Sequence, residues 1–348
     1  MQTITTTPGF VDTLYRRAEV YYNTQGHRRF ATLPCLLKSS LFILLYGAAY
    51  GFFLFGSHQF STMLGWAALL GVCHVLIPVN IAHDAIHGTL SARMWVNHLG
   101  LYGLEITGAN AYMYRKKHLE AHQNKEHGKG VNTIEAQGLL LQKEENNKTV
   151  NLPYIFYLFY AEYMIFVRDF QLFRSYRGSI PTREWRKLYA TKALYAVAFL
   201  MLPFVFIDLP PWQIFCALLL MYFIVTVLLV IILLMPTEKM EHSKIAGNDH
   251  YNDQWAMEIL AHNVDFSPAS RLLNYLAGGA NLNVVHYLFP GTNHIHYNAL
   301  AILVEATAKE YDLLYRKQNV MDVLGIHFNY LKNIQQQESS LPPKAQKA

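Results

Sequence analysis

Two pairs of histidines, in segments remote from each other, share a four-residue spacing: His83 with His87, and His118 with His122. Residues at positions i and i+4 lie on one face of a helix, so each pair can direct two imidazoles at one metal ion. A third cluster, His286, His294 and His296, follows much later in the chain. Histidines from three separate segments predict a metal centre.

The histidines alone do not select the metal, because imidazole suits iron, copper, zinc and nickel. A set of nitrogen ligands gathered at a membrane surface can hold two irons. Two irons with dioxygen can make an oxidant that removes hydrogen from an unactivated methylene. Asp84, next to His83, could accept a ring N–H and fix the tautomer of that ligand. The pattern therefore favours an iron-dependent membrane oxidase.

The composition is that of a membrane protein. Of 348 residues, 52% are hydrophobic and only 15% are charged, against about 25% charged in soluble domains. The three cysteines, Cys35, Cys73 and Cys216, lie in or beside apolar stretches without a CxxC pair, which predicts core thiols in a reducing setting. The formal charge of +5 is spread over several loops, so we expect no nucleic-acid partner.

Four apolar segments approach the length of about 20 residues that crosses a bilayer: 36–56, 63–82, 188–207 and 212–235. They predict two hairpins whose turns, at 57–60 and 208–211, contain no Lys or Arg. By the positive-inside rule, both termini and the 83–187 region face the cytoplasm, which puts every histidine cluster on one side. The polar N-terminus shows no cleavable signal, and a bacterial inner membrane fits this arrangement.

The remaining segments read as parts of one domain over residues 1–335. Segments 95–113 and 153–173 are aromatic but interrupted by charges, so we expect interfacial helices. Segment 124–150 is polar and predicts a cytoplasmic loop, and residues 336–348 predict a disordered tail. The sequence thus predicts an all-α integral membrane protein with four spanning helices.

The three histidine clusters resemble the histidine boxes of membrane fatty acid desaturases, in the linoleoyl-CoA or front-end-like bacterial branch. The matching segments are His83-Asp-Ala-Ile-His87-Gly, Lys117-His-Leu-Glu-Ala-His122-Gln and His286-Tyr-Leu-Phe-Pro-Gly-Thr-Asn-His294-Ile-His-Tyr297. The similarity extends over about residues 10 to 315, including the segments 11–15, 255–258 and 271–279.

The resemblance implies a mushroom-like protein, with four membrane helices under a cytosolic helical cap and an iron centre at their junction. It implies two irons, an acyl chain in a kinked tunnel, and electrons from a ferredoxin or cytochrome b5 with its reductase. Because the sequence has no haem-binding His-Pro-Gly-Gly motif, the donor must be a separate protein. The acyl carrier stays open between CoA, acyl carrier protein and a glycerolipid.

The sequence also departs from the family's ligand pattern. Five histidines match ligand positions: His83, His87, His118, His122 and His286. Gln123, Tyr287 and Glu258 replace three further histidines, and Asn283 precedes the third box. A carboxylate can bridge or chelate iron, so Glu258 is a candidate ligand, the alternative being a solvated charge. We expect Asp84, Gln123, Asn283 and Tyr287 around the ligands, and five histidines could still hold a single iron.

Two classes of function remain open. The first is an enzyme that desaturates, or hydroxylates or acetylenates, a lipid-linked or thioester-linked acyl chain. The second is a weakened homologue that binds acyl lipid or a true desaturase without chemistry. A transporter is disfavoured because His74 is the one ionisable residue in the predicted spans apart from snorkelling residues at their ends. His294 and His296 could be structural or could contact a substrate headgroup.

Overall fold

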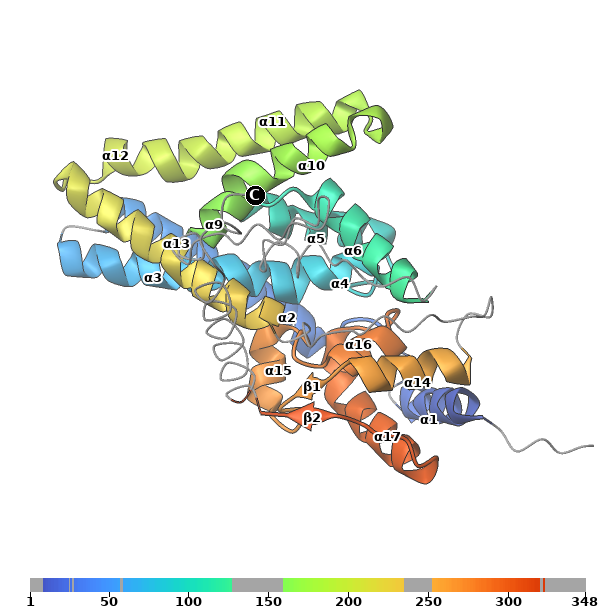
Figure 1. Cartoon of the computed structure of the whole chain (residues 1–348). Coiled ribbons are helices and arrows are strands. Elements are labelled where there is room, and N and C mark those ends of the chain that lie inside the picture. Colours follow the sequence, from blue (N-terminus) through green and yellow to red (C-terminus); the bar gives the residue numbers. More distant parts are fainter. Residues whose placement is uncertain are drawn as a thin grey trace, which may run out of the picture.

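The computed structural model describes residues 9–24, 26, 28–56, 59–126, 159–234, 252–319 and 322. Over these residues the chain is mostly helical, as the sequence predicts (Figure 1). The two strands that occur there, β1 (Asp265–Phe266) and β2 (Lys317–Gln318), form one short parallel pair.

Among the described residues, four helical segments are long and apolar enough to cross a membrane: Leu33–Phe55, Phe60–Ile86, Thr182–Phe206 and Pro211–Leu229. They overlap the four predicted spans, which confirms the prediction of an integral membrane protein. The first is α2 (Leu33–Phe55), and the second joins α3 (Phe60–Ile77), the π-helical turn η1 (Pro78–Ala82) and α4 (His83–Ile86). The third joins α11 (Thr182–Ala196), η4 (Val197–Met201) and α12 (Leu202–Phe206), and the fourth lies in α13 (Pro211–Leu234).

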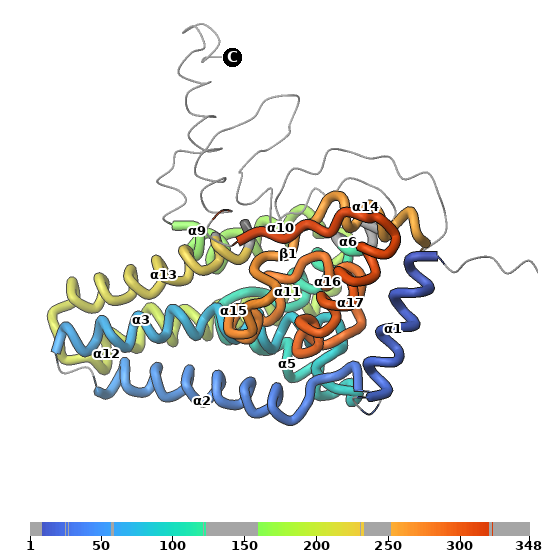
Figure 2. Tube along the Cα trace, turned by 90° about the horizontal axis from the view of Figure 1, so that it is seen from below, coloured from blue at the N-terminus to red at the C-terminus, as the bar shows by residue number. Residues whose placement is uncertain are grey.

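Helix α3 packs between α2 and α13. The contact with α13 is close because Gly71 has no side chain: a Cβ there would lie 2.7 Å from the backbone oxygen of Met221. Buried apolar side chains such as Leu70, Met221 and Phe53 fill the space between the helices. Both views place the C-terminal end of α2, the N-terminal end of α3 and the adjoining ends of α12 and α13 at the same end of the molecule (Figures 1 and 2).

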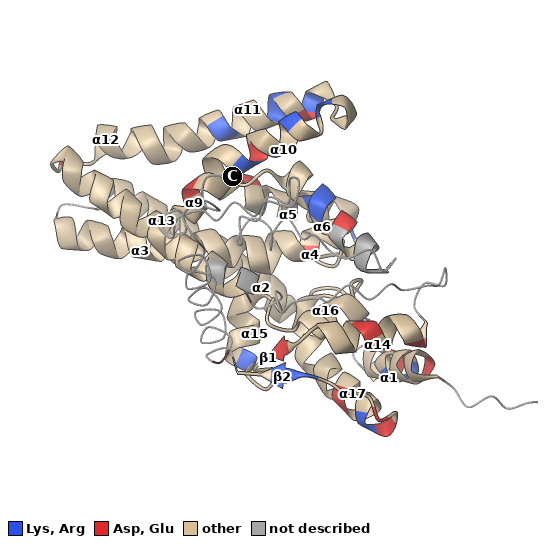
Figure 3. Ribbon diagram, viewed as in Figure 1, with Lys and Arg blue, Asp and Glu red and all other residues tan. Residues whose placement is uncertain are grey.

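The shorter helices lie mostly toward the other end of the molecule (Figures 1 and 2). These are α1 (Phe10–Thr24), α5 (Met94–Ile106), α6 (Ala111–Glu126), α9 (Tyr160–Glu162), η2 (Tyr163–Arg168), α10 (Asp169–Ser175), η3 (Arg177–Ser179), α14 (Asp253–His262), α15 (Arg271–Ala277), α16 (Asn283–Leu288), η5 (His294–His296) and α17 (Tyr297–Glu310). A second core joins α1, α14, α16 and α17. Among described residues, most Lys, Arg, Asp and Glu lie at this end (Figure 3).

The predicted interfacial helix at 95–113 corresponds to α5 and the start of α6. Trp95, Leu99 and Tyr102 are exposed on one face of α5, whereas Gly100 and Leu104 are buried on the other. This amphipathic pattern is the one expected of a helix at a membrane surface. The predicted loop at 124–150 begins inside α6, and its greater part, like the predicted tail at 336–348, lies outside the described residues.

One expectation about the cysteines is wrong. Cys35 and Cys73 are buried free thiols, but Cys216 is exposed on α13. An apolar face in a membrane-spanning helix can point to lipid as readily as to the protein interior, so residence in an apolar stretch does not predict burial within the protein.

Candidate metal centre

The first histidine pair follows a local widening of the second long helix. Pro78 has no backbone N–H to continue the helical hydrogen bonds, and the next turn is π-helical. The Asn80 side chain supports this turn, since its Nδ2 donates to the Leu76 carbonyl at 2.9 Å and to the Leu276 carbonyl at 2.8 Å. Helix α4 then begins at His83, and His87 caps it.

Helix α6, which carries the second pair, has its first turn fixed by buried polar groups. The Asn110 side chain accepts the backbone N–H of Met113 at 2.9 Å, as an N-cap does. The backbone N–H groups of Asn110 and Ala111 donate to the carboxylates of Asp169, at 2.8 Å, and Glu105, at 3.2 Å. Negative charge is favourable at a helix N-terminus, so these contacts hold α6 in place.

The third segment approaches the π-helical turn through two glycines with positive φ, Gly278 and Gly279. A Cβ on Gly278 would lie 2.2 Å from the Val79 carbonyl oxygen, so the close approach requires glycine there. Helix α16 follows and presents His286, whose Nδ1 lies 3.0 Å from the Tyr297 hydroxyl. Remote parts of the chain are thereby brought against α4.

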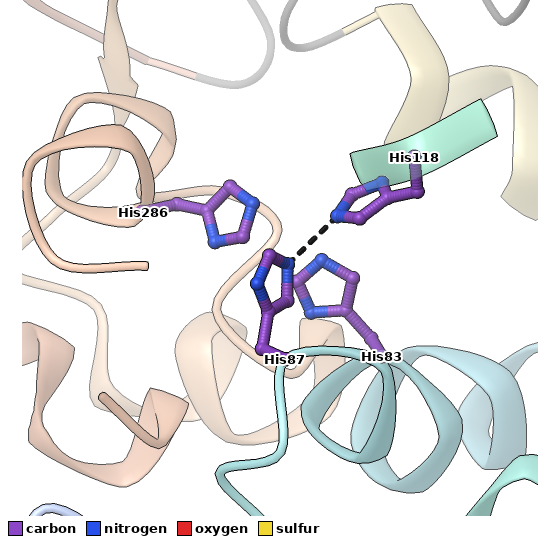
Figure 4. Close-up of side chains that lie close together, drawn as sticks. All are labelled: His83, His87, His118 and His286. Atoms are coloured by element: carbon purple, nitrogen blue, oxygen red, sulfur yellow. Dashed lines mark hydrogen bonds between the residues drawn. The ribbon is translucent and has the colours of Figure 1, made fainter. Parts of the chain in front are cut away.

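Four imidazoles converge at this point: His83, His87, His118 and His286 each offer a nitrogen, and these nitrogens lie within 4.8 Å of one another. Figure 4 shows the four rings pointing toward one another from three different helical segments. The Nε2 of His118 lies 2.8 Å from that of His87 and 3.3 Å from that of His122. The Nε2 of His122 is in turn 2.9 Å from that of His286. The structure therefore brings together the five histidines that match ligand positions, whereas His294 and His296 of the third cluster contact other groups, Asp84 and Tyr21.

The electrostatics of this cluster fit a bound cation. Burial, with neighbouring histidines adding to it, lowers the pKa of His87 and His286 well below the ordinary 6.5, so both are neutral at pH 7. A neutral imidazole has one nitrogen lone pair free to coordinate metal. Imidazole nitrogens lie about 2.1 Å from a zinc-like ion, so nitrogens around one ion are up to about 4.2 Å apart. The spacing of this cluster is close to that geometry.

Asp84 contacts a different imidazole from the one expected. Its Oδ2 accepts from the Nδ1–H of His294 at 2.6 Å and from the Asn293 amide at 2.7 Å. Consecutive helical residues point in directions about 100° apart, so Asp84 faces away from the ligand face of His83 and toward the loop after α16. His294 is buried in this contact, and its other ring nitrogen lies 2.7 Å from Lys38 Nζ.

The other candidate residues occupy varied positions. Tyr287 packs its ring 4.8 Å from the ring of His122, measured between centroids. The Asn283 amide donates to Asn263 at 2.9 Å, which ties α16 to the end of α14. Glu258 is half-buried on α14, which packs against α16, and it is not part of the converging group among the described residues. Gln123 lies on α6, with its side chain outside the described part.

Sequence reasoning missed three residues that support the site: Tyr297, Asn80 and Lys38. The Tyr297 hydroxyl can accept the Nδ1–H of His286 and so leave Nε2 free for a metal, a common arrangement around histidine ligands. The one available signal was the position of Tyr297 at the end of the third box. Lys38 and Asn80 lie in apolar runs whose hydropathy gave no reason to single them out.

Comparison with known proteins accounts for this arrangement. The sequence model of the fatty acid desaturase family matches residues 60–319, which include all five histidines. The chain belongs to the fatty acid desaturase family. It is accordingly an acyl desaturase-type oxidoreductase of lipid metabolism, and its four apolar helices make it an integral membrane desaturase.

Characterised relatives agree with the family match over nearly the whole chain. The sn-1 linoleoyl-lipid 6-desaturase of Arthrospira platensis is 26% identical over 94% of this chain and 92% of its own length. The acyl-lipid (8-3)-desaturase of Physcomitrium patens is 27% identical over 92% of this chain and 70% of its own. The sn-1 linoleoyl-lipid 6-desaturase of Synechocystis is 22% identical over 88% of this chain.

Proposed function

We propose that this desaturase introduces a double bond into a lipid-linked fatty acyl chain at a non-haem iron centre, with dioxygen and external electrons. The observation that carries the proposal is the convergence of His83, His87, His118 and His286, with His122 in contact with two of them. Iron bound there would, with dioxygen, supply the oxidant that removes hydrogen from a methylene group.

The protein's own residues have distinct parts in this proposal. The five histidines would supply the nitrogen lone pairs, and Tyr297 fixes the ring orientation of His286. A group with four nitrogens within 4.8 Å is compact enough for one ion, so two irons require further donors. We assign Glu258 this part, because a carboxylate can bridge two irons and because its helix packs on the helix of His286.

For the substrate we propose an acyl group on a glycerolipid in preference to one on CoA or acyl carrier protein. The support is that the relatives from Arthrospira platensis and Physcomitrium patens are named as desaturases of lipid-linked acyl chains. Electrons would come from a separate ferredoxin or cytochrome b5 with its reductase.

For the architecture we propose two membrane hairpins under a helical cytosolic cap. The charge distribution supports this orientation: among the described residues, the end where α12 adjoins α13 carries few charges, whereas the histidine-bearing end is rich in them (Figure 3). Both termini and the metal centre would then face the cytoplasm, which fits a soluble electron donor and a bacterial inner membrane.

The direct test combines iron content with lipid analysis. The full chain is purified in detergent for iron determination, and it is expressed in cells that also contain ferredoxin and ferredoxin reductase. We expect two irons per chain and a new double bond in the acyl chains of membrane glycerolipids. One iron per chain would remove Glu258 from the centre, and an iron-free protein with unchanged lipids would contradict the proposed function.

A further inference from the structure

Lys38 is deeply buried although it lies in the first membrane-spanning helix. Lysines near span ends usually extend to the membrane surface, but this side chain is only 2% exposed. Its ammonium group donates to three acceptors: Asn80 Oδ1 at 2.8 Å, the Tyr275 carbonyl at 3.1 Å and His294 Nε2 at 2.7 Å. An ammonium has three N–H donors, so Lys38 is fully satisfied inside the protein.

The contact with His294 extends to Asp84. Since Lys38 donates to Nε2, His294 must carry its proton on Nδ1, and that proton is donated to Asp84 Oδ2 at 2.6 Å. A cation and a carboxylate are thus joined through one neutral imidazole. All three side chains are buried, with at most 2% exposed.

This relay holds the helix of the first histidine pair on both sides of His83. Its hydrogen bond to Asn80 fixes the π-helical turn before His83, and its hydrogen bond to Asp84 fixes the turn between His83 and His87. Asn293 adds a further tie, because its amide also donates to Asp84 at 2.7 Å and to the Thr89 carbonyl at 3.3 Å. The ligand-bearing turn is therefore fixed to α2 and to the loop after α16.

The same cluster is not built to hold a second metal. Cys35, Asp84 and His294 offer ligand atoms within 4.8 Å of one another. However, both nitrogens of His294 are already used, and the ammonium of Lys38 occupies the place of a cation beside it. The positive charge that this cluster requires is supplied by the protein itself.

Stability alone does not explain such a relay. Burying an ammonium and a carboxylate carries a large desolvation cost, and well-packed apolar residues often stabilise a fold as well or better. We propose that Lys38, His294 and Asp84 form a positioning relay that sets the direction of His83 and His87 at the metal centre. This inference rests on the proposed function in that it takes those histidines as ligands.

The test uses cobalt(II) as a spectroscopic probe of the full chain in detergent. We expect Lys38→Met to weaken cobalt binding by about 10- to 100-fold, the usual effect of removing support behind a histidine ligand, and to shift the visible absorption bands that report ligand geometry. Hydrogen exchange of residues 82–89 in the metal-free protein should increase. Met221→Ala is the control, since it opens a cavity in the membrane core away from the relay.

The double variant Lys38→Met with Asp84→Asn separates positioning from stability, because no charge is left unpaired. We expect its unfolding temperature to return close to that of the wild type while cobalt binding stays at least tenfold weaker. Recovery of cobalt affinity together with stability would overturn the relay, as would wild-type bands in Lys38→Met. A wild type that binds no cobalt would instead contradict the proposed metal centre.

Discussion

The Nε2 atoms of His122 and His286 lie 2.9 Å apart although 164 positions separate the two residues in the chain. One proton can be shared between two such nitrogens, but the Nε2 of His122 also lies 3.3 Å from the Nε2 of His118. Several lone pairs thus face one another in a small volume. A cation bound there would relieve this repulsion and join α6 to α16.

Removal of any one converging histidine should cost bound metal. We expect alanine at His83, His87, His118, His122 or His286 to lower metal affinity by roughly tenfold or more, because a site with few ligands loses a large share of its binding energy with each. Iron per chain, measured on detergent-purified protein, checks this. The exposed His98 provides the control, and wild-type iron content in all five variants would refute the ligand assignment.

Tyr297 should matter for the metal through a single oxygen atom. Tyr297→Phe removes the hydroxyl beside His286 Nδ1 and leaves the buried ring in place. We expect metal affinity to fall by about tenfold with the fold intact, since groups that orient histidine ligands have effects of this size. Cobalt titration of this variant next to Tyr311→Phe gives the comparison. Equal affinities in the two variants would exclude the orienting role.

Whether Glu258 is a ligand determines whether the centre holds one iron or two. If Glu258 is a ligand of the centre, Glu258→Ala should lose about one iron per chain and all desaturation. Glu258→His would supply a nitrogen donor in place of the carboxylate and should therefore retain more iron than the alanine variant. Iron content and the acyl profile of expressing cells are measured for both variants. Unchanged iron and double-bond content in Glu258→Ala would remove this residue from the mechanism.

Asp265 should make the stability of the protein depend on pH. It is buried beneath α16, where its carboxyl accepts from the Val284 N–H and the Tyr315 hydroxyl. Burial raises the pKa of Asp265 to about 7 from its ordinary 3.8. The folded state then holds a proton that the unfolded state loses, so the free energy of unfolding should fall as pH rises from about 4 to 7, by at most about 1.4 kcal/mol per pH unit.

Asp265→Asn should flatten this part of the profile, because the amide does not ionise: its oxygen can accept from the Val284 N–H, and its NH2 group can donate to the Tyr315 oxygen. Thermal unfolding of metal-free protein in detergent at several pH values provides the measurement, and the difference between wild type and variant isolates this carboxyl. A parallel pair of profiles would show that Asp265 is already ionised at low pH in the folded protein.

The orientation in the membrane can be tested with single cysteines. With Cys216 replaced by serine, cysteine is introduced at Arg177 or at Asp208, both of which are exposed. A maleimide that cannot cross the membrane should label position 208 in intact cells and position 177 only after permeabilisation. The reverse pattern would place the metal centre on the outside.

The sequence was sufficient to predict the long helices and the five clustered histidines, because apolar length and i, i+4 spacing are local signals. It could not predict partners that depend on packing. Asp84 adjoins His83 in the chain, yet it bonds to His294, since neighbouring helical residues point in different directions. Lys38 looked like a residue near a span end, and only the loop after α16 reveals what its ammonium binds.

The π-helical turn from Pro78 to Ala82 also determines the direction in which the ligands after it point, relative to the part of the helix in the membrane core. An α-helix advances about 100° per residue, and a π-turn accommodates one residue more in its turn. A variant that kept every residue but formed a regular α-helix here would therefore turn His83 and His87 by roughly 100° relative to α3, with every ligand still present. The rotational phase of this helix is therefore as much a part of the centre as the imidazoles are.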